Sequence, residues 1–171
     1  MLDTVTGIGY GAFAYDRKIT TLNIPDSLTE IVDYAFLGCS ALESVMLPPN
    51  ITSIPKSAFA YCEKLASIEI PEGVKVIEKW AFSGTRVLRS VKLPESLTTI
   101  GESAFGTSGL TRVTIPSQVT VVPVDAFRSC RNLDTVVLPD SLSEIGKGAF
   151  TSCLALKSVV LPSSVTSIPE K

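Results

Sequence analysis

The sequence consists of one motif that returns about every 23 residues, and this period constrains the fold more than any other feature. The pair Ala-Phe marks each copy, and successive Phe residues are separated by 23, 23, 23, 23, 22 and 23 positions. They are Phe13, Phe36, Phe59, Phe82, Phe105, Phe127 and Phe150. All 7 Phe of the chain therefore belong to one column. A unit of this length cannot bury its apolar face alone, so the copies must stack as a solenoid.

Seven complete units and part of an eighth account for the chain. They begin at Val5, Leu28, Ile51, Val74, Leu97, Val119 and Leu142, and the partial unit begins at Val165. The unit from Leu97 is one residue short, and the loss falls between Phe105 and Leu110, where two Gly indicate a tightened turn. We therefore expect residues 1–171 to form a single array of about 7.5 units rather than a globular core.

Each unit reads L-x-x-I-x-x-x-A-F-x-x-C-x-x-L-x-x-V-x-L-P-x-x. The segment L-x-x-V-x-L predicts a short strand with inward β-branched residues, and the following Pro ends it because Pro has no N–H to donate to a sheet. The L-x-x-I segment predicts a second extended stretch. The A-F-x-x-C corner predicts a helical turn or 3₁₀ piece whose Phe fills the interior. Strands of successive units should pair about 4.8 Å apart.

This unit resembles the leucine-rich repeats of the BspA-like (TpLRR-type) family, whose motif reads much like LxxIgxxAFxxCxxLxxIxIPxx. The resemblance covers essentially the whole chain, and its departures are local, as at Asp16, Thr85 and Ser108 in the Cys column. It implies a right-handed, curved solenoid of short parallel β-strands. It also implies a secreted or cell-surface protein that binds other proteins, often as an adhesin.

Composition excludes several functional classes. The chain has no His, which removes Ser-His-Asp and Cys-His catalysis and every zinc site that needs His. Its net charge of -2 provides no basic footprint for nucleic acid. No apolar run is long enough to cross a membrane, and the first residues do not read as a signal peptide. The carboxylates are scattered over repeated turns, so we expect no enzymatic activity, no metal and no cofactor.

The four Cys share one column of the unit and form two pairs in adjacent units, Cys39 with Cys62 and Cys130 with Cys153. Stacking places paired Cα atoms about 5 Å apart, within reach of a disulfide. The alternative is a ladder of inward thiols that act as small core residues. We favour the ladder, because Asp, Thr and Ser replace Cys in three units without disturbing the period. The two pairs are too far apart to share one zinc ion.

The outward positions of L-x-x-V-x-L form the candidate binding surface, since these positions line the concave face of leucine-rich repeats. The first column comprises Thr21, Ser44, Ser67, Ser90, Arg112, Thr135 and Ser158, and the second comprises Asn23, Met46, Glu69, Lys92, Thr114, Val137 and Val160. Most are small and polar, which suits a solvated sheet as well as a flat protein-binding surface. Met46, Val137 and Val160 are unexpected on a bare solvent face. Arg112 is the residue most typical of an interface.

Three further features concern the surface of the stack. Glu69 and Lys92 are neighbours that we expect to form a surface ion pair. Trp80, Tyr34 and Tyr10 lie just before Ala-Phe, and we expect Trp80 to cover a neighbouring coil rather than to anchor a partner. Basic residues follow Phe in several units, and we interpret them as a solvated rim rather than as a contact for a polyanion or an acidic partner. They are Arg17, Lys18, Lys64, Arg86, Arg128 and Arg131.

Together these features predict a non-enzymatic binding module that presents its sheet face to another protein or to a host matrix component. The alternatives are a structural spacer or stalk of a larger surface protein, and a glycan- or ice-binding surface made by the Thr and Ser ladders. We expect a protein partner, with no nucleic acid and no membrane insertion. Neither end shows a polar cap, so we also expect a fragment of a longer array or end-to-end association between copies.

Overall fold

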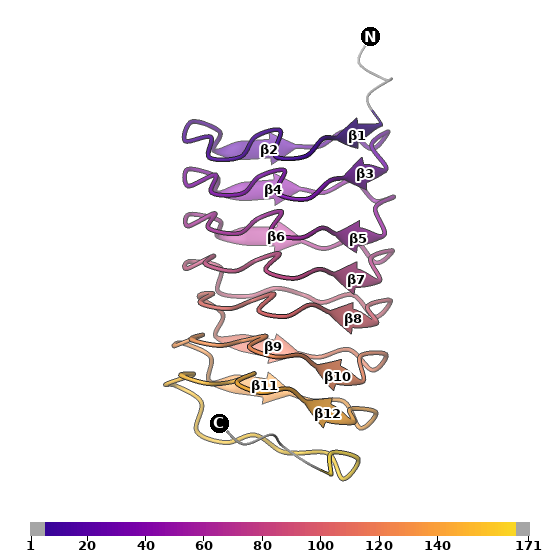
Figure 1. Ribbon diagram of the computed structural model, residues 1–171, viewed down its shortest axis with the longest axis vertical. Coiled ribbons are helices and arrows are strands. Elements are labelled where there is room, and N and C mark those ends of the chain that lie inside the picture. Colours follow the sequence, from indigo (N-terminus) through magenta and orange to yellow (C-terminus); the bar gives the residue numbers. More distant parts are fainter. Residues whose placement is uncertain (1–5, 167–171) are drawn as a thin grey trace.

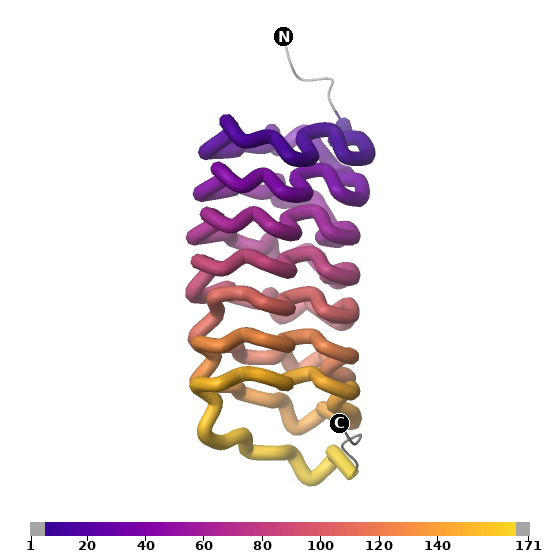
Figure 2. The backbone as a smooth tube through the Cα atoms, turned by 60° about the vertical axis from the view of Figure 1, so that its left-hand side comes forward, coloured from indigo at the N-terminus to yellow at the C-terminus, as the bar shows by residue number. Residues whose placement is uncertain are grey.

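The computed structural model describes residues 6–166, which wind as a right-handed coil whose turns stack in one column (Figures 1 and 2). Within this range every element is a strand of two or three residues, and none is a helix. Each full turn of the coil uses one unit of about 23 residues, so units that follow one another in the sequence lie on one another in space. The predicted solenoid of parallel strands is therefore confirmed.

The three-residue strands form the first column, which we call the strand face. It contains β2 (Thr21–Asn23), β4 (Ser44–Met46), β6 (Ser67–Glu69), β9 (Arg112–Thr114) and β11 (Thr135–Val137). The order β2-β4-β6 is parallel, and β9 pairs with β11 in the same way. The sheet is interrupted between β6 and β9 (Figure 1), where residues 90–92 form no strand next to the short unit.

The two-residue strands form the second column. It contains β1 (Gly7–Ile8), β3 (Glu30–Ile31), β5 (Ser53–Ile54), β7 (Val76–Ile77), β8 (Thr99–Ile100), β10 (Val121–Val122) and β12 (Glu144–Ile145). Hydroxyls beside these strands donate to the preceding coil, as from Thr98 Oγ1 to the Lys75 carbonyl at 3.1 Å and from Ser143 Oγ to the Thr120 carbonyl at 2.9 Å. The Thr98 and Ser143 hydroxyls are thus engaged within the fold.

The Phe column forms the centre of the core. Neighbouring rings are nearly parallel, with centroids 5.3 to 5.6 Å apart along the whole series. The five inner rings are fully buried, whereas Phe13 is 37% exposed and Phe150 is half-buried, because each of these two stacks on one ring only. Buried Ile and Val from both strand columns pack around the rings. Every inner coil therefore contributes the same apolar cross-section.

The Ala-Phe corner is a run of tight turns, which corrects the expected helical turn or 3₁₀ piece. In every coil, the residue before Ala and the residue two after Phe have φ between 52° and 77°. Such left-handed residues interrupt any helix. The first set is Gly11, Tyr34, Ser57, Trp80, Ser103, Asp125 and Gly148, and the second is Tyr15, Gly38, Tyr61, Gly84, Thr107, Ser129 and Ser152.

The left-handed residues direct backbone N–H groups along the stack. In the second coil, for example, Tyr34 N–H donates to Lys56 C=O at 2.9 Å, Phe36 N–H to Ala58 C=O at 3.0 Å and Gly38 N–H to Ala60 C=O at 2.7 Å. The same three bonds recur at each of the six junctions between complete coils. A left-handed non-Gly residue costs about 1–2 kcal/mol, and a satisfied backbone bond offsets a similar amount. We call this set of bonds the corner ladder.

Candidate binding surface on the strand face

The strand face brings the candidate binding residues into two straight columns. Thr21, Ser44 and Ser67 pair in register, as do Asn23, Met46 and Glu69; Arg112 pairs with Thr135, and Thr114 with Val137. The residue between the two columns points inward in each strand, as buried Val45 and Ile68 show. Ser90, Lys92, Ser158 and Val160 continue the columns in coils where no strand forms, and all four are exposed.

Apolar side chains on this face are open to solvent. Met46 is 67% exposed, Val137 48% and Val160 85%. A hollow of about 660 Å³ lies beside Met46, where the face meets the turns that follow Pro48 and Pro71. Its lining comprises Val45, Met46, Leu47, Pro49, Ser67, Ile68, Glu69, Pro71, Glu72 and Gly73. A smaller hollow of about 290 Å³ includes Lys92 and Arg112. The face therefore combines apolar contact area with charged borders.

Lys92 forms its ion pair with Glu72, and the expected pair with Glu69 is wrong. The Lys92 Nζ lies 2.9 Å from Glu72 Oε1, and the other Glu72 oxygen accepts the Glu95 N–H at 3.2 Å. This second bond anchors the Glu72 carboxylate in the turn, within reach of the lysine. The bond from Lys92 lowers the pKa of Glu72, and Glu72 in turn raises the pKa of Lys92.

The four cysteines lie in the interior as free thiols. Each sulfur donates to the Phe carbonyl of the preceding coil, as from Cys39 to Phe13 at 3.0 Å. The equivalent bonds run from Cys62 to Phe36, from Cys130 to Phe105 and from Cys153 to Phe127. Burial is the main cause of the raised pKa values, to about 11 for Cys39 and about 12 for Cys153. These thiols are poor nucleophiles at neutral pH.

Polar residues that replace Cys in this column also bond to the backbone or to the column itself. Asp16 accepts the N–H groups of Lys18 and Ile19 at 2.7 and 2.8 Å. The Thr85 hydroxyl donates to the Phe82 carbonyl at 2.8 Å, and the Ser108 hydroxyl lies 3.2 Å from Cys130 Sγ. The column tolerates four residue types because each of them forms hydrogen bonds at the turn.

Aromatic side chains border the corner outside the strand face. Trp80 is 37% exposed, and the Lys79 Nζ lies 4.3 Å from its ring centroid. Tyr10 and Tyr34 contact each other with ring centroids 5.2 Å apart. Sequence reasoning missed Tyr15 and Tyr61, whose rings cover the left-handed Gly38 and Gly84 of the next coil closely enough that an added Cβ would collide with them. Tyr and Gly alternate in the first four units at the position two residues after Phe, and this alternation could have predicted the contact.

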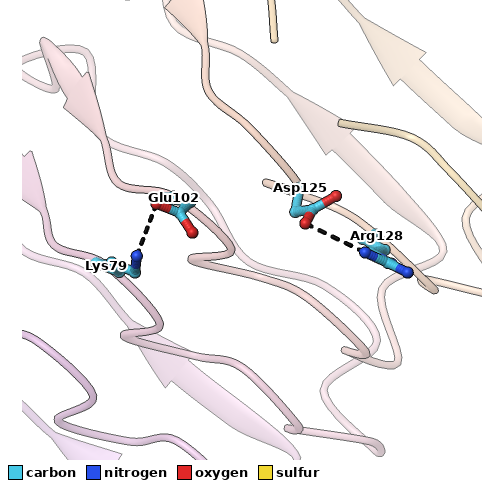
Figure 3. A network of polar contacts seen from close by, with 4 residues as sticks. All are labelled: Lys79, Glu102, Asp125 and Arg128. Carbon is cyan, nitrogen blue, oxygen red and sulfur yellow. Dashed lines mark hydrogen bonds and ion pairs between the residues drawn. The ribbon is translucent and has the colours of Figure 1, made fainter. Parts of the chain in front are cut away.

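Charged side chains on the corner edge pair with one another. Figure 3 shows the Lys79 Nζ pointing to Glu102 Oε2, 2.7 Å away in the next coil, and Arg128 reaching Asp125 at 3.3 Å in its own coil. The Arg86 guanidinium lies 3.7 Å from Glu63. The Arg86–Glu63 pair is exposed at both residues and contributes little to folding stability, whereas the Lys79–Glu102 pair is partly buried.

Residues 6–166 show neither a metal site nor a membrane span. They contain no group of three or more Cys, Asp or Glu side chains placed to hold a metal ion. They also contain no helix of the length and apolar character that would cross a bilayer.

Comparison with known proteins agrees with this geometry. The model of the BspA type leucine rich repeat region matches the chain in six copies, over residues 1–85 and 52–171. A leucine-rich repeat protein from Bacteroides ovatus is 28% identical, with a TM-score of 0.67 over 98% of this chain and 55% of its own. The leucine-rich repeat protein TpLRR from T. pallidum is also 28% identical, with a TM-score of 0.69 over 82% of this chain and 79% of its own.

The pneumococcal vaccine antigen PcpA shares the fold at 20% identity, with a TM-score of 0.58 over 95% of this chain and 57% of its own. No curated protein is similar enough to count as a match. The chain spans little more than half of the B. ovatus protein and of PcpA. Leucine-rich repeat proteins of this type are often surface proteins that mediate protein interactions, and they are typically binding modules rather than enzymes. Since the repeat model covers its whole length, the chain belongs to the BspA-type leucine-rich repeat family.

Proposed function

We propose that the chain is a non-enzymatic module that binds another protein or a host matrix component through the strand face, as part of a secreted or cell-surface protein. The observation that carries the proposal is the exposure of Met46 and Val137 in the outward columns of an otherwise polar sheet. Exposed apolar side chains with polar borders are typical of interface cores.

The hollow beside Met46 supports the same function. It gives an incoming side chain a concave contact, and central, desolvated contacts of this kind supply most of the affinity in protein interfaces. The ion pair of Lys92 with Glu72 lies at the border of this area, where charges affect association rate and specificity more than affinity.

The test compares two double variants of equal charge. M46K/V137K places lysines on the strand face, and V121K/V124K places them on exposed valines outside it. Each variant is immobilised beside the wild type and exposed to purified extracellular matrix proteins and to serum. We expect retained partners to bind M46K/V137K at least tenfold more weakly, and V121K/V124K as well as the wild type.

Equal capture by all three proteins contradicts binding through the strand face. Absence of any saturable partner supports the spacer alternative. The spacer alternative does not explain why apolar residues are exposed on the strand face.

A further inference from the structure

The residues that follow each Ala-Phe corner form one edge of the stack. This edge has a notch at the coil of the short unit. In the coils before and after it, the fourth and fifth residues after Phe are Arg86 with Val87 and Arg131 with Asn132, whereas the short coil has only Gly109. A hollow of about 480 Å³ occupies this place. It is lined by Arg86, Thr107, Ser108, Ser129, Arg131 and Asn132, all of them polar or charged.

Backbone packing explains the notch. The Gly109 N–H donates to the Thr85 carbonyl of the preceding coil at 3.0 Å. A Cβ on Gly109 would collide with the Arg86 carbonyl, so the backbone of the short coil lies directly against its neighbour there. The missing residue thus leaves the edge unfilled between Arg86 and Arg131, which lie two coils apart in the stack.

The two arginines have donor groups to spare. Arg86 contacts Glu63 only at 3.7 Å, and both side chains are more than half exposed. Arg131 is exposed, and no carboxylate in residues 6–166 forms an ion pair with it. A guanidinium has five N–H donors in a fixed plane, which suits sulfate, phosphate and carboxylate groups.

Between the arginines the wall is made of hydroxyls and an amide. Thr107 and Ser129 are left-handed members of the corner ladder, and their N–H groups bond to the next coil at 2.7 and 2.8 Å. The ladder therefore holds their backbone in place. Ser108 already bonds to Cys130, whereas the side chains of Thr107, Ser129 and Asn132 have no hydrogen-bond partner among the residues described.

We propose that this notch binds an acidic sugar unit of a glycan. The sulfate or carboxylate of the sugar bonds to the guanidinium groups of Arg86 and Arg131, and its hydroxyls bond to Thr107, Ser129 and Asn132. The hollow is within the size range of small-molecule sites. With a net charge of -2, the chain suits one anionic unit better than a long polyanion that depends on counterion release. The notch lies outside the strand face, so this proposal does not rest on protein binding there.

The experiment measures binding of short sugars to the whole chain by isothermal titration calorimetry. The probes are a sulfated, uronate-containing disaccharide, the same disaccharide without sulfate, lactose, inorganic sulfate and a phosphoserine peptide. R86Q and R131Q each remove one guanidinium, and R17Q is the matched control, because Arg17 occupies the same repeat position away from the notch. A fourth variant inserts Asn between Ser108 and Gly109 and so restores the 23-residue period.

We expect the acidic disaccharide to bind and lactose not to bind. R86Q and R131Q should each weaken binding about tenfold or more, as expected for the loss of a charge-assisted bond. R17Q should bind like the wild type, and the insertion should abolish binding while circular dichroism stays unchanged. The disaccharide without sulfate identifies which anionic group is recognised: full affinity assigns the carboxylate, and lost affinity assigns the sulfate.

Four results overturn the proposal. They are absence of binding by the acidic disaccharide, equal affinity for inorganic sulfate, tighter binding of the phosphoserine peptide, and an equal loss in R17Q. The strand-face variant M46K/V137K keeps full sugar binding if the two sites are separate, so failure at one site is distinguishable from failure at the other.

Discussion

The Ala-Phe corner repeats the same contacts in every coil, whereas the strand face changes its side chains from one coil to the next. At the corner, each junction between complete coils has the same three backbone bonds, and the Phe rings remain 5.3 to 5.6 Å apart. On the strand face, one column runs through Asn, Met, Glu, Lys, Thr and Val. The repeated contacts that stabilise the stack therefore lie in the corner and the interior, whereas the proposed binding uses positions of the strand face that the fold does not constrain.

The largest expected effect is at the centre of the Phe column. F82A should lower the free energy of unfolding by about 3–5 kcal/mol, because the ring is fully buried between Phe59 and Phe105. F150A should lower the free energy of unfolding clearly less, since Phe150 is half-buried and stacks on Phe127 alone. Urea denaturation followed by circular dichroism measures both. Equal losses would contradict the greater contribution of the central rings.

A smaller effect is expected from glycines that pack against the previous coil. A Cβ on Gly101 would collide with the backbone of Lys79, so G101A should cost about 1–3 kcal/mol through overpacking. Gly9 occupies the same repeat position but has nothing within 4 Å among the residues described, and G9A is the matched control. The same denaturation measurement checks the pair. Similar stabilities for both variants would refute the close approach of coils at Gly101.

The buried thiols should make stability depend on alkaline pH. Cys39 has a pKa of about 11 in the fold, against 9.0 for an ordinary thiol. The unfolded chain therefore loses this proton first, and the contribution is intact below pH 9 and is lost as pH rises toward 11. Comparing urea curves at pH 8 and pH 10 for the wild type and C39S isolates the thiol from Lys and Tyr. An unchanged pH dependence in C39S would argue against a buried, neutral Cys39.

The smallest effect on stability is expected on the strand face. M46K/V137K should change the free energy of unfolding by no more than about 0.5 kcal/mol, because both side chains are already exposed. Thermal melts against the wild type check this value and also serve as the folding control for the binding test. A loss as large as that of G101A would mean that these residues stabilise the fold, and would weaken the contrast between face and corner.

Much of the fold could be predicted because a fixed period assigns each residue type to one environment. The Phe column, the strands that end at Pro and the in-register outward columns of the strand face follow from a 23-residue repeat and elementary sheet geometry. Because each coil packs only on its neighbours, a departure from the repeat changes the structure only nearby. Even the residue missing near Gly109 leaves the core intact.

The corner geometry could not be predicted, because Trp80 and Tyr34 are residue types that rarely adopt positive φ. They do so here because the corner ladder uses their N–H groups. The partner of Lys92 was also missed. An exposed side chain can reach neighbours in several coils. Glu72 pairs with Lys92 because the Glu95 N–H holds the Glu72 carboxylate in place, and no periodic pattern reveals that bond. The notch is a further example, since it depends on how the backbone closes around a missing residue.

The corner ladder also gives the stack a direction. Its inter-coil bonds all run from an N–H in one coil to a carbonyl in the next, whereas bonds beside the strand face run both ways, as in Ile24 N–H to Met46 C=O and Glu43 N–H to Thr20 C=O. Peptide dipoles in the ladder therefore add along the axis, as they do in a helix. Unlike a helix, the ladder points its N–H groups toward the C-terminal side, so that side is the positive pole and attracts anions.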